Sequence, residues 1–188
     1  MLLKELTHLI TKGTTPSTIG YKFVNEGVSF LKVESIDSYG GIVSSKLEHI
    51  TEECNEKMVR SQLRDNDVLI TIAGALGRTT VVTSKLLPAN INQAIAILRP
   101  KIDTILPLYL HYYLSTDKMQ KIINGYNAQS AQPNINLTQL GELEIDVPNI
   151  EIQKHIVDTI CFALKYQLLW LLILCFLQRV LVIHLMFS

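Results

Sequence analysis

Amide, guanidinium, ammonium and hydroxyl side chains gather in four short polar stretches, at residues 12–17, 74–78, 90–93 and 129–134. Arginine and lysine pair with guanine, and asparagine and glutamine with adenine, through hydrogen bonds to base edges. Backbone amides at glycine turns and small hydroxyls suit phosphate oxygens, which set position rather than sequence. These residue types therefore favour nucleic-acid reading over bond breaking. The candidates are Lys12, Thr14, Thr15, Ser17, Gly74, Gly77, Arg78, Asn90, Asn92, Gln93, Gln129, Ser130, Gln132 and Asn134.

The same residue types also fill ordinary loops, because asparagine, glycine, serine and threonine adopt turn conformations easily. Charge does not decide between the two interpretations. The whole chain is formally neutral, and residues 1–160 hold 15 of the basic residues and all 17 of the acidic ones. A strongly basic nucleic-acid clamp is therefore excluded, while a local basic stripe is compatible with this balance.

Sequence patterns that carry catalysis are missing. The segment GALGRTT at residues 74–80 resembles a phosphate-binding loop, but the motif's first glycine would fall on Ile72 and its lysine on Arg78. No lysine follows an acid by two residues, as in nucleases with metal-bound carboxylates, and no methyltransferase tetrapeptide of the N-P-P-Y type occurs. No G-x-S-x-G, C-x-x-C or H-x-x-x-H spacing occurs either. We expect no active site, metal site or cofactor in this chain.

The stretch from Asp67 to Pro100 must position two of the polar stretches. Its runs at residues 68–72, 79–83 and 94–98 are rich in β-branched and apolar residues, which predicts three strands. The small residues at 73–78 then predict a turn between strands. Glycine, arginine, asparagine and glutamine would stand at the tips of this sheet.

Apolar spacing and capping residues predict the flanking elements, with caps at Thr51 and within Ser115-Thr116-Asp117, and Tyr39-Gly40-Gly41 predicts a turn. We expect helices at residues 2–11, 51–63, from 107, at 115–125, at 138–140 and from 151, and strands at 28–36 and 143–147. No internal repeat is present. The fold class is therefore a mixed α+β fold, with one globular β-sheet-rich domain at residues 1–148 and a long C-terminal helix within residues 149–188.

Residues 161–188 change character, since they contain only two charged residues and thirteen uncharged ones in a row from Tyr166 to Gln178. That run is shorter than the roughly 20 residues that span a bilayer. We interpret it as a buried helix against a partner or a second copy, with a membrane span or a shifted reading frame as alternatives. The low, odd cysteine count and the charged Lys4 and Glu5 near the start fit a cytoplasmic protein.

Seven short segments occur in the order found in specificity (S) subunits of type I restriction–modification systems. Over residues 1–160 the chain resembles one target recognition domain of that family with its following conserved helix. The matching segments are Gly13-Thr14-Thr15-Pro16-Ser17, Asp67–Thr71 with Gly74 and Gly77-Arg78, Asn92-Gln93, Pro107–Leu114, Gln132–Leu137, Val147-Pro148 and Ile152–Val157.

The resemblance implies a non-catalytic DNA-binding subunit that directs other subunits to a target. The implied partners are double-stranded DNA, an adenine methyltransferase (M) subunit and, through the complex, a restriction (R) subunit. S-adenosylmethionine, ATP and Mg would belong to those partners. Partner-binding positions implied on the conserved helix are Ile152, Ile156, Val157 and Ile160.

The chain departs from the family pattern in two ways. It has one recognition domain where such subunits normally carry two, so a homodimer or a second half-subunit would complete the reader. Symmetric pairing predicts an interrupted palindromic target. Beyond Ile160 the helix lacks the Glu/Lys-rich pattern, which leaves a truncated or frame-disrupted product open. The alternative function is a non-DNA interaction module, anchored to a membrane or partner by the apolar tail.

Overall fold

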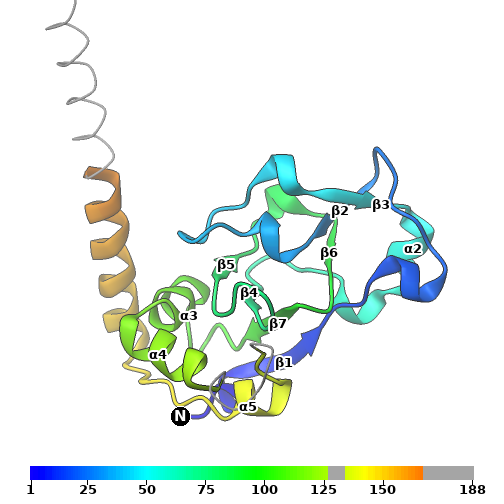
Figure 1. Ribbon diagram of the computed structural model, residues 1–188. Coiled ribbons are helices and arrows are strands. Elements are labelled where there is room, and N and C mark those ends of the chain that lie inside the picture. Colours follow the sequence, from blue (N-terminus) through cyan, green and yellow to red (C-terminus); the bar gives the residue numbers. More distant parts are fainter. Residues whose placement is uncertain (127–133, 167–188) are drawn as a thin grey trace, which may run out of the picture.

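The computed structural model describes residues 1–126 and 134–166, and these contain two β-sheets flanked by helices (Figure 1). The four-stranded sheet is antiparallel, in the order β1 (Thr7–Lys12), β7 (Ile95–Pro100), β4 (Val68–Thr71) and β5 (Thr79–Val81). The three-stranded sheet has the order β3 (Glu48–Ile50), β2 (Val28–Leu31) and β6 (Ala89–Ile91), and its β2–β6 pair is parallel.

The central strands β4 and β7 read as continuous apolar runs because both faces of their sheet are covered. Alternate side chains face two separate cores. Val68 and Ile70 lie in one core, and Leu69 and Ile97 lie in the other. The three central strands predicted from the sequence, and the turn between the first two, are therefore confirmed.

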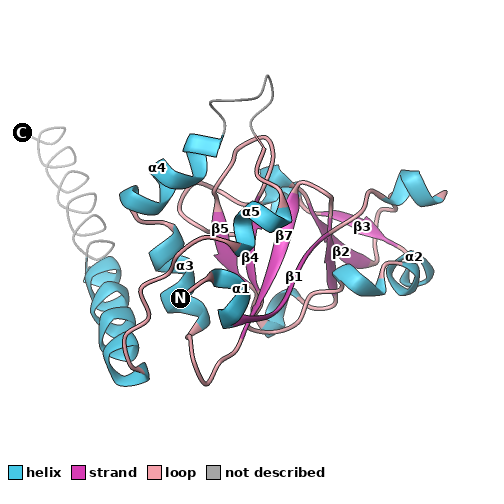
Figure 2. Cartoon of the chain, turned by 90° about the horizontal axis from the view of Figure 1, so that it is seen from below, coloured by secondary structure: helices cyan, strands magenta, loops and turns pink. Residues whose placement is uncertain are grey.

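Helices cover one face of the four-stranded sheet, and the second sheet lies toward the other (Figure 2). The covering helices are α1 (Leu3–Leu6), α3 (Pro107–Leu114), α4 (Asp117–Gly125) and α5 (Leu137–Gly141), while α2 (Glu52–Lys57) packs beside the second sheet. Thr116 and Thr51 cap α4 and α2, since their side chains accept hydrogen bonds from the backbone N–H groups of Met119 and Cys54. These caps are the ones predicted from the sequence.

The helix predicted at residues 2–11 is wrong over most of its length. Only Leu3–Leu6 is helical, and Thr7–Lys12 forms strand β1, in which Thr11 pairs with Ile97 of β7. Pairing along an entire neighbouring strand outweighs a local helical spacing of leucines, because helix propensity is only a weak prior.

Other boundaries also differ from the prediction. The strand expected at residues 28–36 ends at Leu31, and the helix expected at 51–63 ends at Lys57. Residues 143–147 form no strand, although Glu144 makes a single bridge to Leu2. Strand β6 was missed, since it places the polar Asn90 between two apolar neighbours in a stretch read as a loop.

The C-terminal helix, described for residues 150–166, is anchored to the domain at its first turn. The side chain of Gln153 is fully buried: its Oε1 accepts from Leu106 N at 2.9 Å, and its Nε2 donates to Thr104 O at 2.9 Å and Pro148 O at 2.8 Å. Farther along the helix, the Tyr112 hydroxyl of α3 lies 3.5 Å from Cys161 Sγ, so the helix runs beside α3 (Figure 2). Within the described residues, no helix is both long and apolar enough to cross a membrane.

The partner-binding positions predicted on this helix do not share one environment. Val157 is buried in the domain's own core and is not free for a partner, and Ile156 is partly buried against that core. The prediction for Val157 is therefore wrong. Ile152 is 47% exposed and Ile160 is half-buried. The most exposed apolar side chain on the helix is Phe162, at 61%.

Candidate nucleic-acid interface

One end of the four-stranded sheet gathers three of the four predicted polar stretches. In an antiparallel sheet, one strand ends where its neighbour begins, so β1 and β4 end beside the starts of β7 and β5. The register pairs Lys12 with Ala96, Thr71 with Ile95 and Ile70 with Thr79. We call this group, residues 12–17, 73–78, 92–94 and 134, the loop end of the sheet.

Asn134 also belongs to the loop end. It forms a bridge with Ala73, and the neighbouring Ile135 N donates to Ile72 O at 3.0 Å. Three other candidates, Gln129, Ser130 and Gln132, lie outside the described residues. The fourth predicted stretch is thus tied to the site through its last residue.

The first stretch, residues 12–17, lies directly against the chain at residues 91–93. A Cβ on Gly13 would fall 1.9 Å from Ile91 O, and the Gly13 N–H donates to Ile95 O at 3.4 Å. Only glycine permits this approach of two backbones. Lys12 and Ser17 are exposed beside it, and Thr14 and Thr15 are half-buried.

Gln93 is exposed at the loop end, and its orientation is set by a neighbour from the first stretch. The Thr15 hydroxyl donates to the Gln93 side-chain oxygen. Asn92 has a different role, because its Oδ1 accepts from Ala94 N at 3.1 Å and closes the local turn. The two neighbouring amides therefore differ in role: the Asn92 side chain stabilises the loop, and the Gln93 side chain is exposed on its surface.

The β4–β5 turn is held by Thr71 at its base. The Thr71 hydroxyl accepts from Arg78 N at 2.9 Å and donates to Ala75 O, while Gly77 N donates to Thr71 O at 2.9 Å. Gly74 and Gly77 have φ values of +75° and +81°, which favour glycine. The segment is a tight turn between strands, as the sequence predicted.

Arg78 and Gln120 tie this turn to distant elements. The Arg78 guanidinium donates from Nη1 to Ile36 O at 2.7 Å, and the residue is half-buried. Gln120 of α4 donates from Nε2 to Gly77 O at 2.9 Å and to Leu114 O at 2.8 Å. Sequence reasoning did not identify Gln120, because its partners are more than 40 residues away or across a helix junction.

Asn90 was predicted to bind DNA, and the structure contradicts this prediction. Its side chain is fully buried; it donates to Asn55 Oδ1 at 2.9 Å and Met58 O at 3.2 Å, and its Oδ1 accepts from Ile91 N. A buried amide with its hydrogen bonds satisfied by protein is a structural joint. Asn90 fastens β6 to the α2 region and cannot reach DNA in this structure.

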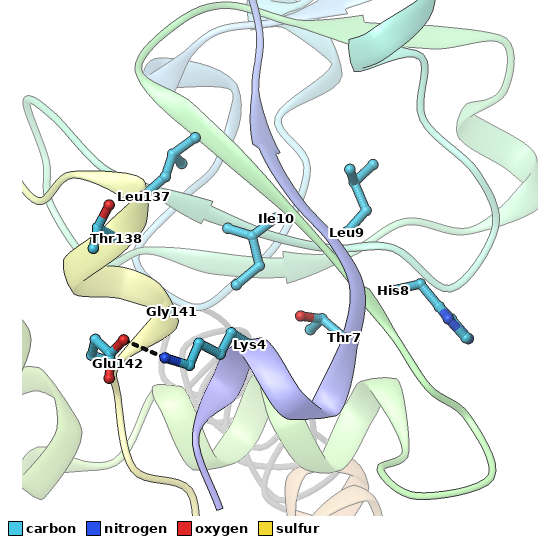
Figure 3. A pocket seen from close by; sticks show the side chains of 9 residues that line it. All are labelled: Lys4, Thr7, His8, Leu9, Ile10, Leu137, Thr138, Gly141 and Glu142. Carbon is cyan, nitrogen blue, oxygen red and sulfur yellow. Dashed lines mark hydrogen bonds and ion pairs between the residues drawn. The ribbon is translucent and has the colours of Figure 1, made fainter.

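A second surface feature lies away from the predicted residues (Figure 3). A hollow of about 440 Å³ lies on the surface where α1 and β1 meet α5, and His8, Leu9 and Thr138 are among the residues that line it. An exposed ion pair between Lys4 Nζ and Glu142 Oε1 crosses one side of it. The charges in the hollow are paired, and none of the predicted site residues lines it. Among the described residues, no cluster of three potential metal-binding side chains occurs.

Comparison with protein families shows a match to the type I restriction modification DNA specificity domain over residues 1–161. The chain is 32% identical over 134 residues to the EcoBI specificity subunit of Escherichia coli, covering 71% of this chain and 28% of that one. It is 30% identical over 159 residues to the putative MjaX specificity subunit of Methanocaldococcus jannaschii, covering 82% and 36%. The chain thus spans roughly a third of the length of these curated relatives.

Solved structures show the same fold. A chain from a study of complex assembly and conformational transition in a type I R-M system superposes with a TM-score of 0.67 at 22% identity, covering 88% of this chain and 38% of that one. The HsdS subunit from Thermoanaerobacter tengcongensis superposes with a TM-score of 0.68 at 16% identity, covering 88% and 41%. The predicted mixed α+β fold is confirmed.

Proposed function

Since this chain belongs to the type I restriction modification DNA specificity family, we propose that it binds DNA sequence-specifically and directs a methyltransferase to its target. The observation that carries this proposal is the loop end, where residues 12–17, 73–78 and 92–94 meet and where Lys12, Ser17 and Gln93 are exposed. Loops set on a rigid sheet are a common place for binding residues.

Two exposed side chains at the loop end are suited to base edges. Gln93 carries a carboxamide that pairs with adenine, and Lys12 carries an ammonium group that pairs with guanine. The Thr15 hydroxyl limits the rotation of the Gln93 side chain, which lowers the entropy lost when Gln93 binds a base. Thr14 and Ser17 suit phosphate oxygens beside them.

We further propose that the C-terminal helix carries the protein partners. Three of its exposed side chains, Ile152, Phe162 and Leu164, are large and apolar, and exposed apolar groups on one helix favour packing against another protein. An adenine methyltransferase subunit and a second copy or half-subunit are the proposed partners, with the restriction subunit joining through the complex. Catalysis, S-adenosylmethionine, ATP and Mg then belong to those subunits, in the cytoplasm.

The comparisons give no support to the alternative of a non-DNA interaction module. That alternative rested on the tail at residues 161–188, of which residues 167–188 lie outside the part of the chain that the structure describes.

The proposal is tested with Gln93→Ala in complex with the methyltransferase. We expect discrimination between target and non-target DNA to fall roughly ten- to a hundredfold, the usual worth of one paired base contact. Asn25→Ala is the matched control, since Asn25 is an exposed amide before the start of β2, away from the loop end. Methylation mapping of the bound DNA gives the readout.

Two outcomes would contradict different parts of the proposal. Unchanged discrimination in both Gln93→Ala and Lys12→Ala would remove the assignment of base readers. A wild-type complex that binds all DNA sequences equally would remove the proposed function itself.

A further inference from the structure

A rigid hairpin at residues 36–42 presents the most exposed aromatic ring among the described residues. Tyr39, at its tip, is 93% exposed. Below it, Asp37 Oδ1 accepts hydrogen bonds from Tyr39 N and Gly41 N, both at 2.8 Å, and Ile36 bridges to Ile42. The backbone is therefore fixed while the phenol stands in solvent. Sequence reasoning had identified this segment only as a turn.

The hairpin is attached to the loop end of the sheet. Arg78, the last residue of the β4–β5 turn, donates to Ile36 O at 2.7 Å. On the other side, a Cβ on Gly40 would lie 2.8 Å from Thr79 O, so the hairpin packs directly on the first residue of β5. The hairpin that carries Tyr39 therefore flanks the predicted DNA-binding loops on the β5 side of the sheet.

A small cavity of about 230 Å³ lies between the hairpin and the turn. Its lining contains one cation and no acid: Ser38, Gly40, Leu76, Gly77, Arg78, Thr79, Ser115 and Gln120. A surface recess with a guanidinium and hydroxyl groups, and without carboxylates, favours an anion.

The polar side chains of Thr79 and Ser115, which line this cavity, already form hydrogen bonds within the protein. The Thr79 hydroxyl lies 2.8 Å from His111 Nδ1 and 2.9 Å from Ser115 Oγ. Burial lowers the pKa of His111, so this imidazole is neutral near pH 7 and adds no charge. Arg78 is the one cation of the lining, and its bond to Ile36 uses one of the five N–H groups of a guanidinium.

We propose that Tyr39 and Arg78 bind a phosphate of the DNA backbone on the flank of the loop end. The proposal rests on the proposed function and adds a residue, Tyr39, and a ligand group, the phosphodiester. Arg78 lines the cavity and keeps N–H groups that its bond to Ile36 O does not use. Tyr39 stands between the lining residues Ser38 and Gly40, and its phenol supplies a second donor. Such a contact fixes the register of the domain on DNA and leaves the choice of bases to Gln93 and Lys12.

The experiment measures binding of the complete methyltransferase complex to target and non-target DNA over a range of salt concentrations. We expect Tyr39→Phe, which removes only the hydroxyl, to weaken binding to both DNAs by the same factor, about three- to tenfold. Ser38→Asp, which places a carboxylate in the cavity lining, should weaken both further. Arg78→Gln should lower the slope of log affinity against log salt by about 0.9, the value for one phosphate contact.

Val59→Ala serves as the control, because Val59 is 68% exposed and follows α2, beside the second sheet. Unfolding temperatures show that each variant is folded. Unaltered binding in Tyr39→Phe and Ser38→Asp would overturn the proposal. If Tyr39→Phe led to methylation of a new DNA sequence, the proposal would be overturned in favour of base reading. If Tyr39→Phe no longer bound the methyltransferase in the absence of DNA, it would be overturned in favour of a protein contact. Failure of the proposed function is recognised separately, from a wild-type complex without sequence preference.

Discussion

The two ends of the four-stranded sheet use similar polar groups for opposite purposes. At the loop end, Lys12 and Gln93 are exposed. At the other end, where β4 begins and β7 ends, Asp67 is 1% exposed and holds Arg99 through two bonds of 2.8 Å, from Nε to Oδ1 and from Nη2 to Oδ2. The backbone N–H of Arg64 also donates to Asp67 at 2.8 Å. We call this second group the closed end.

The difference shows that burial, rather than residue type, separates the structural side chains from those proposed to recognise DNA. Asn90 and Gln153 are buried amides with several protein partners, whereas Gln93 is an exposed amide held by one hydroxyl. A buried polar group without its partner costs free energy, so it must stay bonded within the protein. An exposed group exchanges water for DNA at little cost to the fold.

The largest effect is expected from a substitution that breaks the Asp67–Arg99 ion pair at the closed end. Asp67→Ala leaves the guanidinium of Arg99, which is only 18% exposed, without its carboxylate. We expect a loss of about 3–5 kcal/mol in the free energy of unfolding, the usual cost of removing one partner from a buried pair. Urea denaturation measures it. As a control, Lys4→Ala breaks the exposed Lys4–Glu142 pair and should lower the free energy of unfolding by no more than about 1 kcal/mol. Equal losses of stability in the two variants would contradict the difference between the buried and the exposed ion pair.

The second effect disturbs the fold at the loop end. Gly13→Ala places a methyl group 1.9 Å from Ile91 O, a backbone atom, so the two segments must separate. We expect a destabilisation of about 1–3 kcal/mol or more, together with weaker DNA binding. Gly125→Ala is the control, since among the described residues no atom outside the helix's own backbone lies within 4 Å of the new Cβ, and it should leave stability unchanged or slightly raised. A fully stable Gly13→Ala would show that the approach is not required.

A smaller effect separates recognition from stability. Thr15→Val keeps the shape of the side chain but removes the hydrogen bond to Gln93. We expect base discrimination to weaken by about 0.5–1.5 kcal/mol, the net worth of one hydrogen bond, with the unfolding free energy nearly unchanged. Competition binding and urea denaturation on the same preparation give both values. A loss of stability larger than the loss of discrimination would place Thr15 with the structural residues.

The smallest effect concerns pH. Burial lowers the pKa of His111 in the folded state, so the unfolded chain binds a proton more readily than the folded one. Its contribution to stability is present above the unfolded pKa of about 6.5 and is lost as pH falls below it. His111→Gln should therefore lose less stability than the wild type between pH 7.5 and pH 5.5. Parallel losses in both proteins would show that His111 does not control this dependence.

The sheet was predictable because its strands carry a strong local signal. The runs Val68–Thr71 and Ile95–Pro100 are apolar and β-branched, and the glycine-rich segment between β4 and β5 leaves few alternatives to a turn. The caps at Thr51 and Thr116 were found for the same reason, since a cap depends on a few neighbouring residues.

The failures share one cause, which is dependence on distant partners. Strand β1 exists because β7 pairs with it, and nothing within residues 7–12 reveals that pairing. Asn90 looked like a loop residue because its partners, Asn55 and Met58, lie more than 30 positions earlier. Tyr39 was missed since its importance lies in exposure on a hairpin fixed by Arg78. The order of weak motifs did identify the family, and that identification is confirmed.

The close approach of Gly13 to Ile91 has a consequence for how a new DNA target could arise. The Gly13 N–H also donates a hydrogen bond to Ile95 O of β7, while Ile91 belongs to β6. The backbone of one short loop therefore contacts a strand of each sheet. The neighbouring side chains at positions 12, 17 and 93 are exposed and take no part in that joint. Under the proposed function, recombination or mutation can therefore exchange these three side chains and alter the DNA target while the scaffold stays intact.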